Sequence, residues 1–218
     1  MPHTTKPQAA VSAITPPVFV VAAHRLLADG RPVPFRPSPH GGSPIRPAYL
    51  VLHYTAGLTA ASAIGWFLDP RAKASAHLVI GRDGAVTQMM AFDRSAWHAG
   101  VSAFAGLTGL NSHSIGIEMV NAGKLVRGPA GGWRTWTGDP VPEADVLIAR
   151  HRNEPSDAAW HRYSEAQVAT VAAIGAALHL AYRFKGVVGH EDIAPRRKVD
   201  PGPAFPLAEV ASRIMGNG

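Results

Sequence analysis

The sequence predicts a single α/β domain in which a central mixed β-sheet is flanked by helices. Three observations lead to this prediction. Short apolar runs typical of buried strands recur along the chain, a capped stretch with helical spacing begins at Ser164, and Asp83-Gly84 separates two strand-like runs. Because the strands are interleaved with helices, an α/β arrangement is expected.

The first 47 residues are rich in Pro, Gly, Ser and Arg. We expect an irregular N-terminal arm over residues 1–47 and the folded domain over residues 48–218. Pro16 and Pro17 interrupt the early apolar stretch, and only Lys6 precedes it as a basic residue. A signal peptide needs a basic start and an unbroken apolar segment, so none is expected, and the protein should be cytoplasmic as synthesised.

The first part of the domain is expected to contain a strand, a helix and a hairpin. Residues 48–53 form a continuous apolar run, which predicts a buried strand. Thr59 is a suitable N-cap for a helix over residues 59–68. The Asp83-Gly84 pair supplies the positive φ angles of a tight turn, which predicts a hairpin over residues 77–90.

The second part of the domain alternates in the same way. Residues 114–120 have the alternation of a strand, and residues 124–159 form a long stretch without a sustained period, which predicts a loop with a binding role or mobility. Ser164 begins the clearest helix, with a capping box. Residues 186–188 predict a last short strand, and Pro206 starts a terminal helix.

The composition excludes several classes of protein. The chain of 218 residues has 46% hydrophobic and 17% charged residues, which is typical of a globular protein, and no apolar run reaches the roughly 20 residues of a membrane span. It has no cysteine, so any metal site would use histidine and carboxylate ligands. The net charge of +6 indicates a solvated surface or an anionic partner. Nucleic acid is not expected, because the basic residues are not clustered.

The segment from Gly189 to Phe205 is the most informative about chemistry. His190 and Asp200 lie in a stretch that several prolines make rigid, and such a loop can hold two metal ligands in a fixed geometry. His53, at the end of a buried strand, is the candidate third ligand. Two histidines and one carboxylate leave a position open for water, as in catalytic zinc sites. Each residue also has a structural reading, as a hydrogen-bonded histidine or a turn anchor.

Five pieces of the sequence together resemble the zinc-dependent N-acetylmuramoyl-L-alanine amidases. In order they are VLHYTAG (51–57), SAHLVIGRDG (75–84), WHAG (97–100), NSHSIGIEMVN (111–121) and GHEDIAPRRKVDPGPAF (189–205). That superfamily includes AmpD-type amidases, phage lysozymes of the amidase type and peptidoglycan recognition proteins. The resemblance is greatest to the AmpD branch, covers roughly residues 48 to 214, and implies the fold of this superfamily.

The resemblance implies roles for the matching residues. His53, His190 and Asp200 match the zinc ligands, Glu118 matches the catalytic acid of AmpD-like members, and Lys198 matches the lysine beside the zinc. An isolated glutamate in a strand could instead face solvent.

The resemblance also indicates where substrate would lie. His98 and Asn121 match positions that border the substrate cleft in relatives, and Tyr54 and Trp97 are further candidate substrate contacts. Tryptophans also fill cores, so a packing role is the alternative for Trp97. For His77 we favour a structural role over ligation.

The implied reaction is hydrolysis of the amide bond between N-acetylmuramic acid and L-alanine of the stem peptide. Zinc would activate water, Glu118 would accept its proton, and Lys198 would stabilise the oxyanion. The substrate would be peptidoglycan or a muropeptide, and a monomer without a membrane span is expected. A recognition module without catalysis and a peptidase acting within the stem peptide are the alternatives. A recycling enzyme, an endolysin-like enzyme, or an effector that reaches the periplasm by lysis or injection all fit the sequence.

Overall fold

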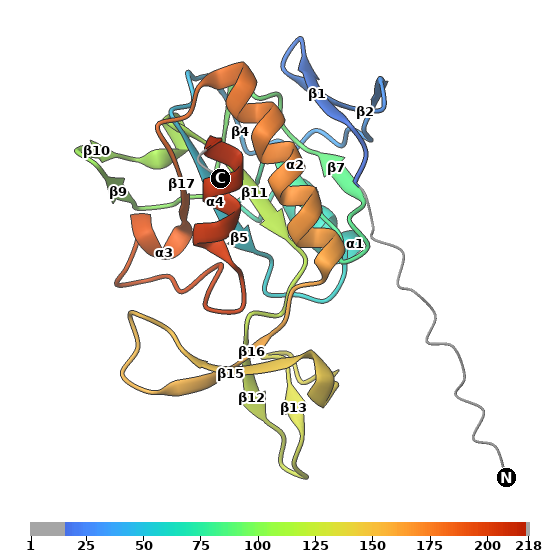
Figure 1. Ribbon diagram of the computed structural model, residues 1–218, viewed down its shortest axis with the longest axis vertical. Coiled ribbons are helices and arrows are strands. Elements are labelled where there is room, and N and C mark those ends of the chain that lie inside the picture. Colours follow the sequence, from blue (N-terminus) through green and yellow to red (C-terminus); the bar gives the residue numbers. More distant parts are fainter. Residues whose placement is uncertain (1–15, 217–218) are drawn as a thin grey trace, which may run out of the picture.

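The computed structural model describes residues 16–216, which form a main body around a mixed sheet and a smaller β lobe (Figure 1). Within these residues the central sheet has five strands, in the order β17-β5-β11-β6-β7. Their bounds are β17 Gly186–Gly189, β5 Tyr49–Tyr54, β11 Ser114–Met119, β6 Leu78–Ile80 and β7 Val86–Gln88. The strands from β17 to β6 run parallel, whereas β7 pairs antiparallel with β6, so the predicted α/β fold with a mixed sheet is confirmed.

Helices cover both faces of the central sheet. Helices α2 (Glu165–Tyr182) and α4 (Leu207–Met215) lie side by side on one face (Figure 1). Helix α1 (Ala60–Leu68) packs near β6, and the single turn α3 (His190–Ile193) follows β17 directly. The predicted caps are confirmed, because the side chain of Thr59 accepts from Ser62 N, and Ser164 forms a capping box with Gln167.

The alternation of side chains along β5 and β11 separates the core from the functional face. Leu50 and Leu52 of β5 enter the core with α2 and α4, so the intervening Val51 and His53 point to the opposite face. On β11, Ile117 enters the same core, and Glu118 pairs in register with His53. The sheet therefore places His53 and Glu118 next to each other on the face away from α2.

The prediction that residues 1–47 are irregular is wrong for the part of the arm that the structure describes. Strands β1 (Phe19–Ala22), β2 (Arg25–Ala28) and β3 (Arg31–Pro32) form an antiparallel sheet, and β4 (Gly41–Pro44) pairs with β8 (Arg94–Ala96). The turn residues Asp29 and Gly30 both have positive φ, as a two-residue hairpin with a type I′ turn requires. This Asp-Gly pair is a hairpin signal, but it stands in a segment whose proline-rich composition favoured an irregular arm. The boundary at residue 48 stays a prediction, and the expectation about a signal peptide depends mainly on residues outside the described range.

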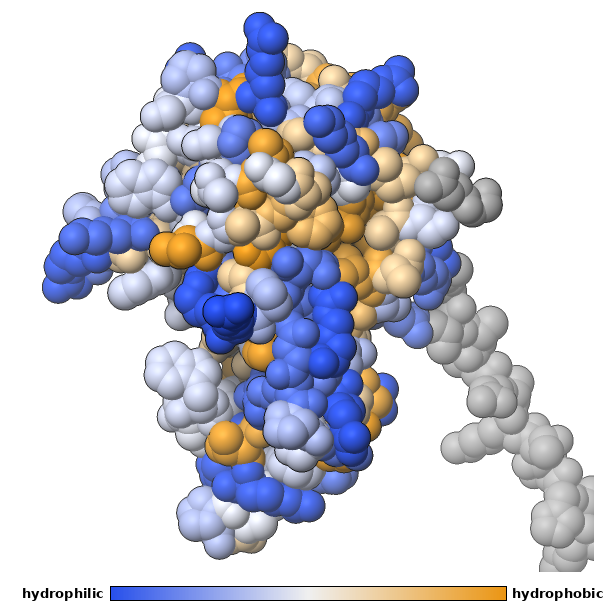
Figure 2. Space-filling model, turned by 90° about the vertical axis from the view of Figure 1, so that its left-hand side faces the viewer, coloured by the Kyte–Doolittle hydropathy of each residue, from blue (hydrophilic) through white to orange (hydrophobic). Residues whose placement is uncertain are grey.

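The long loop predicted over residues 124–159 is also wrong, because this segment is a small sheet. Its strand order is β14-β13-β12-β16-β15. The bounds are β12 Lys124–Arg127, β13 Trp133–Arg134, β14 Pro140–Val141, β15 Val146–Arg150 and β16 Asp157–His161. Strands of two to five residues separated by Gly-rich and Pro-rich turns are too short to give a sustained period. We call residues 124–161 the β subdomain; Figure 2 shows it as a narrower lobe with a largely hydrophilic surface on that side.

A short hairpin of β9 (Ala103–Phe104) and β10 (Leu107–Thr108) and two short 3₁₀ turns complete the described structure. Between residues 16 and 216, none of the helices is both long enough and apolar enough to cross a bilayer.

His77, which precedes β6, is a fully buried histidine with both ring nitrogens bonded. Its Nε2–H donates to Arg94 O at 2.8 Å, and its Nδ1 accepts from Gly116 N at 3.0 Å. This bonding fixes the neutral form, and burial lowers the pKa of His77 to about 4. The structural role favoured for His77 therefore agrees with its contacts.

Acidification is expected to destabilise the protein through His77. An unfolded histidine binds a proton near pH 6.5, whereas folded His77 stays neutral until about pH 4, so stability is lost as pH falls between these values. The loss should reach about 1.4 kcal/mol per pH unit for this one residue. Urea denaturation from pH 7.5 to 4.5 measures the slope, and a His77→Gln variant should give a shallower one. Equal slopes in both proteins would contradict the prediction.

Candidate metal centre and active-site cleft

His53, His190 and Asp200 converge at the carboxyl ends of the parallel strands. β5 and β17 are neighbours, and His190 follows β17 directly, so the two histidines meet at one edge of the sheet. His53 Nδ1 lies 2.9 Å from His190 Nδ1, and Asp200 Oδ2 lies 3.1 and 3.0 Å from these two atoms. All three residues are buried, and among the described residues they form a group that could hold a metal ion.

A chain of hydrogen bonds fixes the tautomer of His53. The hydroxyl of Ser114 donates to Leu110 O at 2.6 Å, so its oxygen accepts from His98 Nε2–H at 3.3 Å. Neutral His98 can then only accept at Nδ1, where His53 Nε2–H donates at 2.9 Å. His53 Nδ1 therefore turns a free lone pair towards His190 and Asp200.

The same reasoning applies to His190, whose Nε2–H donates to Ala99 O at 3.1 Å. Burial, and next the charge of His190, lowers the pKa of His53 to about 4, which favours its neutral form at pH 7. Two imidazole lone pairs and a carboxylate oxygen thus face one another, and a cation placed between them would bind all three. Ligands of a tetrahedral ion with bonds of 2.0–2.1 Å lie about 3.3 Å apart, close to the spacing seen here. The residues fit a metal site.

Loss of the Ser114 hydroxyl is expected to weaken metal binding about tenfold, the scale of outer hydrogen bonds to metal ligands. Without it, His98 can adopt the other tautomer and no longer hold His53 Nε2–H. A chelating dye in competition for zinc measures the dissociation constant of Ser114→Ala. Ser43→Ala, at an exposed position, is the control. Equal zinc affinity in the two variants would contradict the inference that the Ser114 hydroxyl fixes the tautomer of His53 through His98.

Glu118 faces the three candidate metal ligands with a carboxyl oxygen that has no partner within residues 16–216. Its Oε2 atom is buried and accepts no hydrogen bond from the described residues. Burial, and next the negative charge of Asp200, raises the pKa of Glu118 well above its ordinary value, while the charge of Lys198 opposes this shift. A buried carboxyl group with an unused oxygen and a raised pKa is typical of a general acid or base.

A cleft of about 1020 Å³ connects these groups. Glu118, Lys198, His190 and Asp200 line it at the metal end. Its remaining walls come from the loop after β5, from α1, from the stretch around Trp97 and from the turn between β13 and β14. The cleft therefore brings the candidate catalytic residues and the candidate metal ligands to one open space.

The four candidate substrate contacts differ in position. Tyr54 and Trp97 line the cleft. His98 also lines it, but its two ring nitrogens bond to His53 and Ser114, so its contacts are those of a positioning residue.

Asn121 is not brought to the cleft, which contradicts the expectation that it borders substrate. Its side chain is fully buried, its amide donates to the carbonyls of His161 and Arg162, and its oxygen accepts from Gly123 N. These bonds join the end of β11 to the β subdomain. The position of Asn121 in the sequence, next to the strand end, could not show whether its side chain points to the cleft or to the β subdomain.

Glu191 and His151 are important residues that carried no signal in the sequence. Glu191 Oε2 accepts from Gly202 N at 3.1 Å and lies 2.7 Å from His151 Nε2, while Glu191 N donates to Asp200 O at 2.9 Å. Glu191 thus ties the loop that carries Asp200 to the helix that carries His190, and to the β subdomain. The two partners lie 40 residues apart, so no local pattern indicates the pair.

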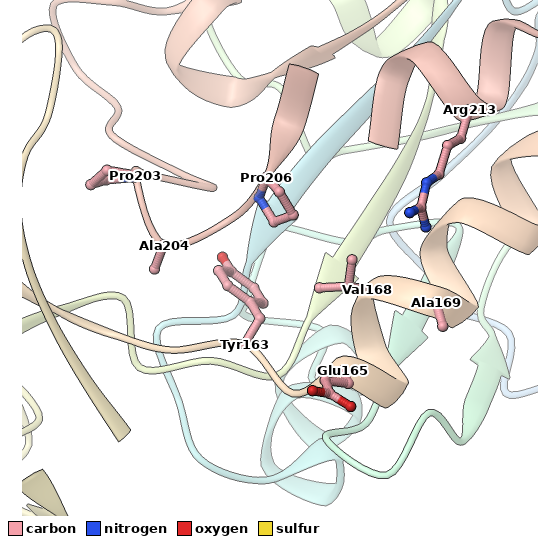
Figure 3. A pocket seen from close by; sticks show the side chains of 8 residues that line it. All are labelled: Tyr163, Glu165, Val168, Ala169, Pro203, Ala204, Pro206 and Arg213. Carbon is pink, nitrogen blue, oxygen red and sulfur yellow. The ribbon is translucent and has the colours of Figure 1, made fainter. Parts of the chain in front are cut away.

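A second hollow, of about 470 Å³, lies between the start of α2 and the segment before α4 (Figure 3). Its walls are mainly alanine, valine and proline side chains, with Tyr163, and with Glu165 and Arg213 as its charged groups. Neither the candidate metal ligands nor Glu118 lines it, so the candidate catalytic residues belong to the larger cleft.

A family model described as N-acetylmuramoyl-L-alanine amidase matches residues 43–203. Among curated relatives, the 1,6-anhydro-N-acetylmuramyl-L-alanine amidase AmpD of Escherichia coli is 36% identical over 138 residues, or 62% of this chain and 56% of the relative. The N-acetylmuramoyl-L-alanine amidase AmiD of the same organism is 30% identical over 187 residues, or 77% of this chain and 53% of the relative. The chain thus spans about half the length of these curated relatives.

Solved structures agree with the family match. A selenomethionine derivative of AmpD aligns with a TM-score of 0.53 at 29% identity, over 82% of this chain and 92% of that chain. Escherichia coli AmiD, in complex with anhydro-N-acetylmuramic acid-L-Ala-D-γ-Glu-L-Lys, aligns with a TM-score of 0.59 at 27% identity, over 90% of this chain and 65% of that chain. The resemblance seen in the sequence motifs is confirmed: the chain belongs to the N-acetylmuramoyl-L-alanine amidase family.

Proposed function

We propose that this protein is a zinc-dependent N-acetylmuramoyl-L-alanine amidase. It would hydrolyse the amide bond between N-acetylmuramic acid and L-alanine of the stem peptide in peptidoglycan or muropeptides. The observation that carries the proposal is the group of three lone pairs from His53, His190 and Asp200, with a carboxyl oxygen of Glu118 in the same cleft that has no partner among the described residues. The family match supports the choice of bond.

Zinc is the proposed metal because two imidazoles and one carboxylate are among its preferred ligands, and because three protein ligands leave a position for water. When bound, it supplies Lewis-acid activation of water and of the scissile carbonyl. A chain without cysteine offers no thiolate alternative.

The proposed reaction assigns proton transfer to Glu118 and charge stabilisation to Lys198. Glu118 accepts a proton from the attacking water and passes it to the nitrogen of the leaving L-alanine, and its raised pKa suits both steps. Lys198 lines the same end of the cleft, where its ammonium would stabilise the oxyanion that forms from the carbonyl. Tyr54 and Trp97 are the proposed substrate contacts along the cleft.

Removal of the metal tests the proposal. Chelation is expected to abolish release of stem peptide from a muramoyl-peptide, and added zinc to restore it. Mass spectrometry of the products identifies the bond, because an amidase releases an intact stem peptide with a free L-alanine N-terminus. Undiminished hydrolysis by the metal-free protein would contradict the zinc site, and fragments cut within the peptide would indicate a peptidase.

The cellular setting and the monomeric state stay as predictions from the sequence. Comparison of intact sacculi with a soluble anhydro-muropeptide separates an enzyme of the cell wall from a recycling enzyme. Size-exclusion chromatography with light scattering measures the oligomeric state.

A further inference from the structure

Three tryptophans with exposed faces line the cleft beyond the metal end. Trp66 of α1 is 55% exposed, Trp97 is 44% exposed, and Trp136 of the β subdomain is 70% exposed. By contrast, Trp160 is fully buried in the β subdomain. Large aromatic side chains left open to solvent along one cleft are typical of a binding surface.

Trp136 is held in place although it is exposed. Its indole N–H donates to Ala56 O at 2.7 Å, and this bond links the β subdomain to the loop that follows β5. The turn that carries it is closed by Gly138 N bonding to Thr135 O at 3.0 Å and by Thr137 Oγ1 bonding to Asp139 at 2.7 Å. The ring therefore presents a fixed open face, and a prearranged face loses little conformational entropy when a ligand stacks on it.

The charges in the cleft indicate what would lie on these faces. Among the described residues, the lysine and arginine side chains that line it are Arg197 and Lys198, and Arg197 is fixed at the metal end by bonds to Ala99 O and Val101 O, both at 2.9 Å. The described residues that α1 and the turn around Trp136 contribute to the cleft include no lysine or arginine. An anionic stem peptide would remain unpaired there, whereas a sugar ring offers a neutral, flat C–H face and hydroxyl groups.

The size of the cleft suits a ligand that extends beyond the two groups joined by the scissile bond. Its volume of about 1020 Å³ reaches the top of the roughly 300–1,000 Å³ range of small-molecule pockets. We propose that Trp66 and Trp136 form a glycan-binding wall that stacks on sugars next to the muramic acid being released from its peptide. The preferred substrate is then a glycan chain that carries stem peptides. This inference rests on the proposed amidase function.

The test compares two substrates in the zinc-loaded protein: a muramoyl-peptide with a single sugar, and uncrosslinked glycan strands that carry the same peptide. The unaltered protein should have at least tenfold higher kcat/KM for the strands. Trp66→Ala and Trp136→Ala should each lower the ratio of the two kcat/KM values about tenfold, through KM, because one stacking contact is lost. Phenylalanine at either position should retain most of the ratio.

Leu180→Ala is the matched control, because Leu180 is 68% exposed on α2 and does not line the cleft. If the tryptophan variants leave the ratio of the two kcat/KM values unchanged, the glycan-binding wall is overturned and the proposed amidase function is not affected. Equal losses on both substrates would place the muramoyl-peptide itself on the tryptophans, and would also overturn it.

A binding measurement separates this inference from the proposed function. Peptide-free glycan strands should change the tryptophan fluorescence of the unaltered protein saturably, and of Trp136→Ala much more weakly. If neither substrate is cut, the amidase proposal fails, but the fluorescence titration still shows whether the glycan-binding wall binds glycan strands. Absence of saturable binding in the unaltered protein would overturn the wall.

Discussion

Glu118→Gln is expected to lower kcat on a muramoyl-peptide about 1,000-fold, within the roughly 10²–10⁴ range of general acid–base catalysis, while zinc stays bound. Glutamine keeps the shape of the side chain but cannot accept a proton from water. Glu118 lies outside the group of three atoms that could hold the metal, so its loss should not remove a ligand. Because Oε2 has no partner among the described residues, the substitution breaks no hydrogen bond at that atom.

The measurement needs both turnover and metal content. Steady-state kinetics gives kcat, and elemental mass spectrometry gives the zinc bound to each protein. Asp200→Asn is the contrasting variant, expected to lose zinc and activity together, and the exposed Glu209→Gln is the control. Loss of zinc from Glu118→Gln would instead make Glu118 a ligand or a support of the site, and retained turnover would exclude it as the acid and base.

The candidate metal ligands and the central sheet could be predicted because their signals in the sequence are local. The strands that carry His53 and Glu118 are apolar or alternating, and the segment around His190 and Asp200 is stiffened by neighbouring prolines. The parallel register that sets His53 beside Glu118 follows from these strands once they are paired.

The remaining parts depend on contacts between distant segments, which a single sequence does not reveal. The short strands of the β subdomain are stabilised by one another, and His161 at its edge is bonded through its carbonyl to Asn121. A motif at position 98 indicates that the histidine is near the site, but only the bonds to His53 and Ser114 show that it orients a ligand. A resemblance in sequence thus predicts where a residue lies, whereas its bonding partners come from the three-dimensional contacts.

Glu191→Ala is expected to lower the free energy of unfolding by about 3 kcal/mol, the scale for breaking a buried polar network. Glu191 is 7% exposed and His151 is 2% exposed, so the substitution leaves Gly202 N and His151 without their buried partner. The loop that carries Asp200 would also lose its side-chain bond to α3 and keep only the backbone bond from residue 191 N to Asp200 O, so zinc affinity should fall as well.

Urea denaturation in the presence of chelator measures the stability without the contribution of bound metal. Arg152→Ala is the matched control: Arg152 bonds to the same Glu191 at 2.9 Å, but its side chain is 51% exposed, so its loss should cost less than about 1 kcal/mol. In a double-mutant cycle, Glu191→Ala and His151→Ala together should destabilise by less than the sum of the single variants, because either one already breaks the buried pair. Strictly additive losses would mean that the two residues act independently, and that the β subdomain is not coupled to the metal loop through this contact.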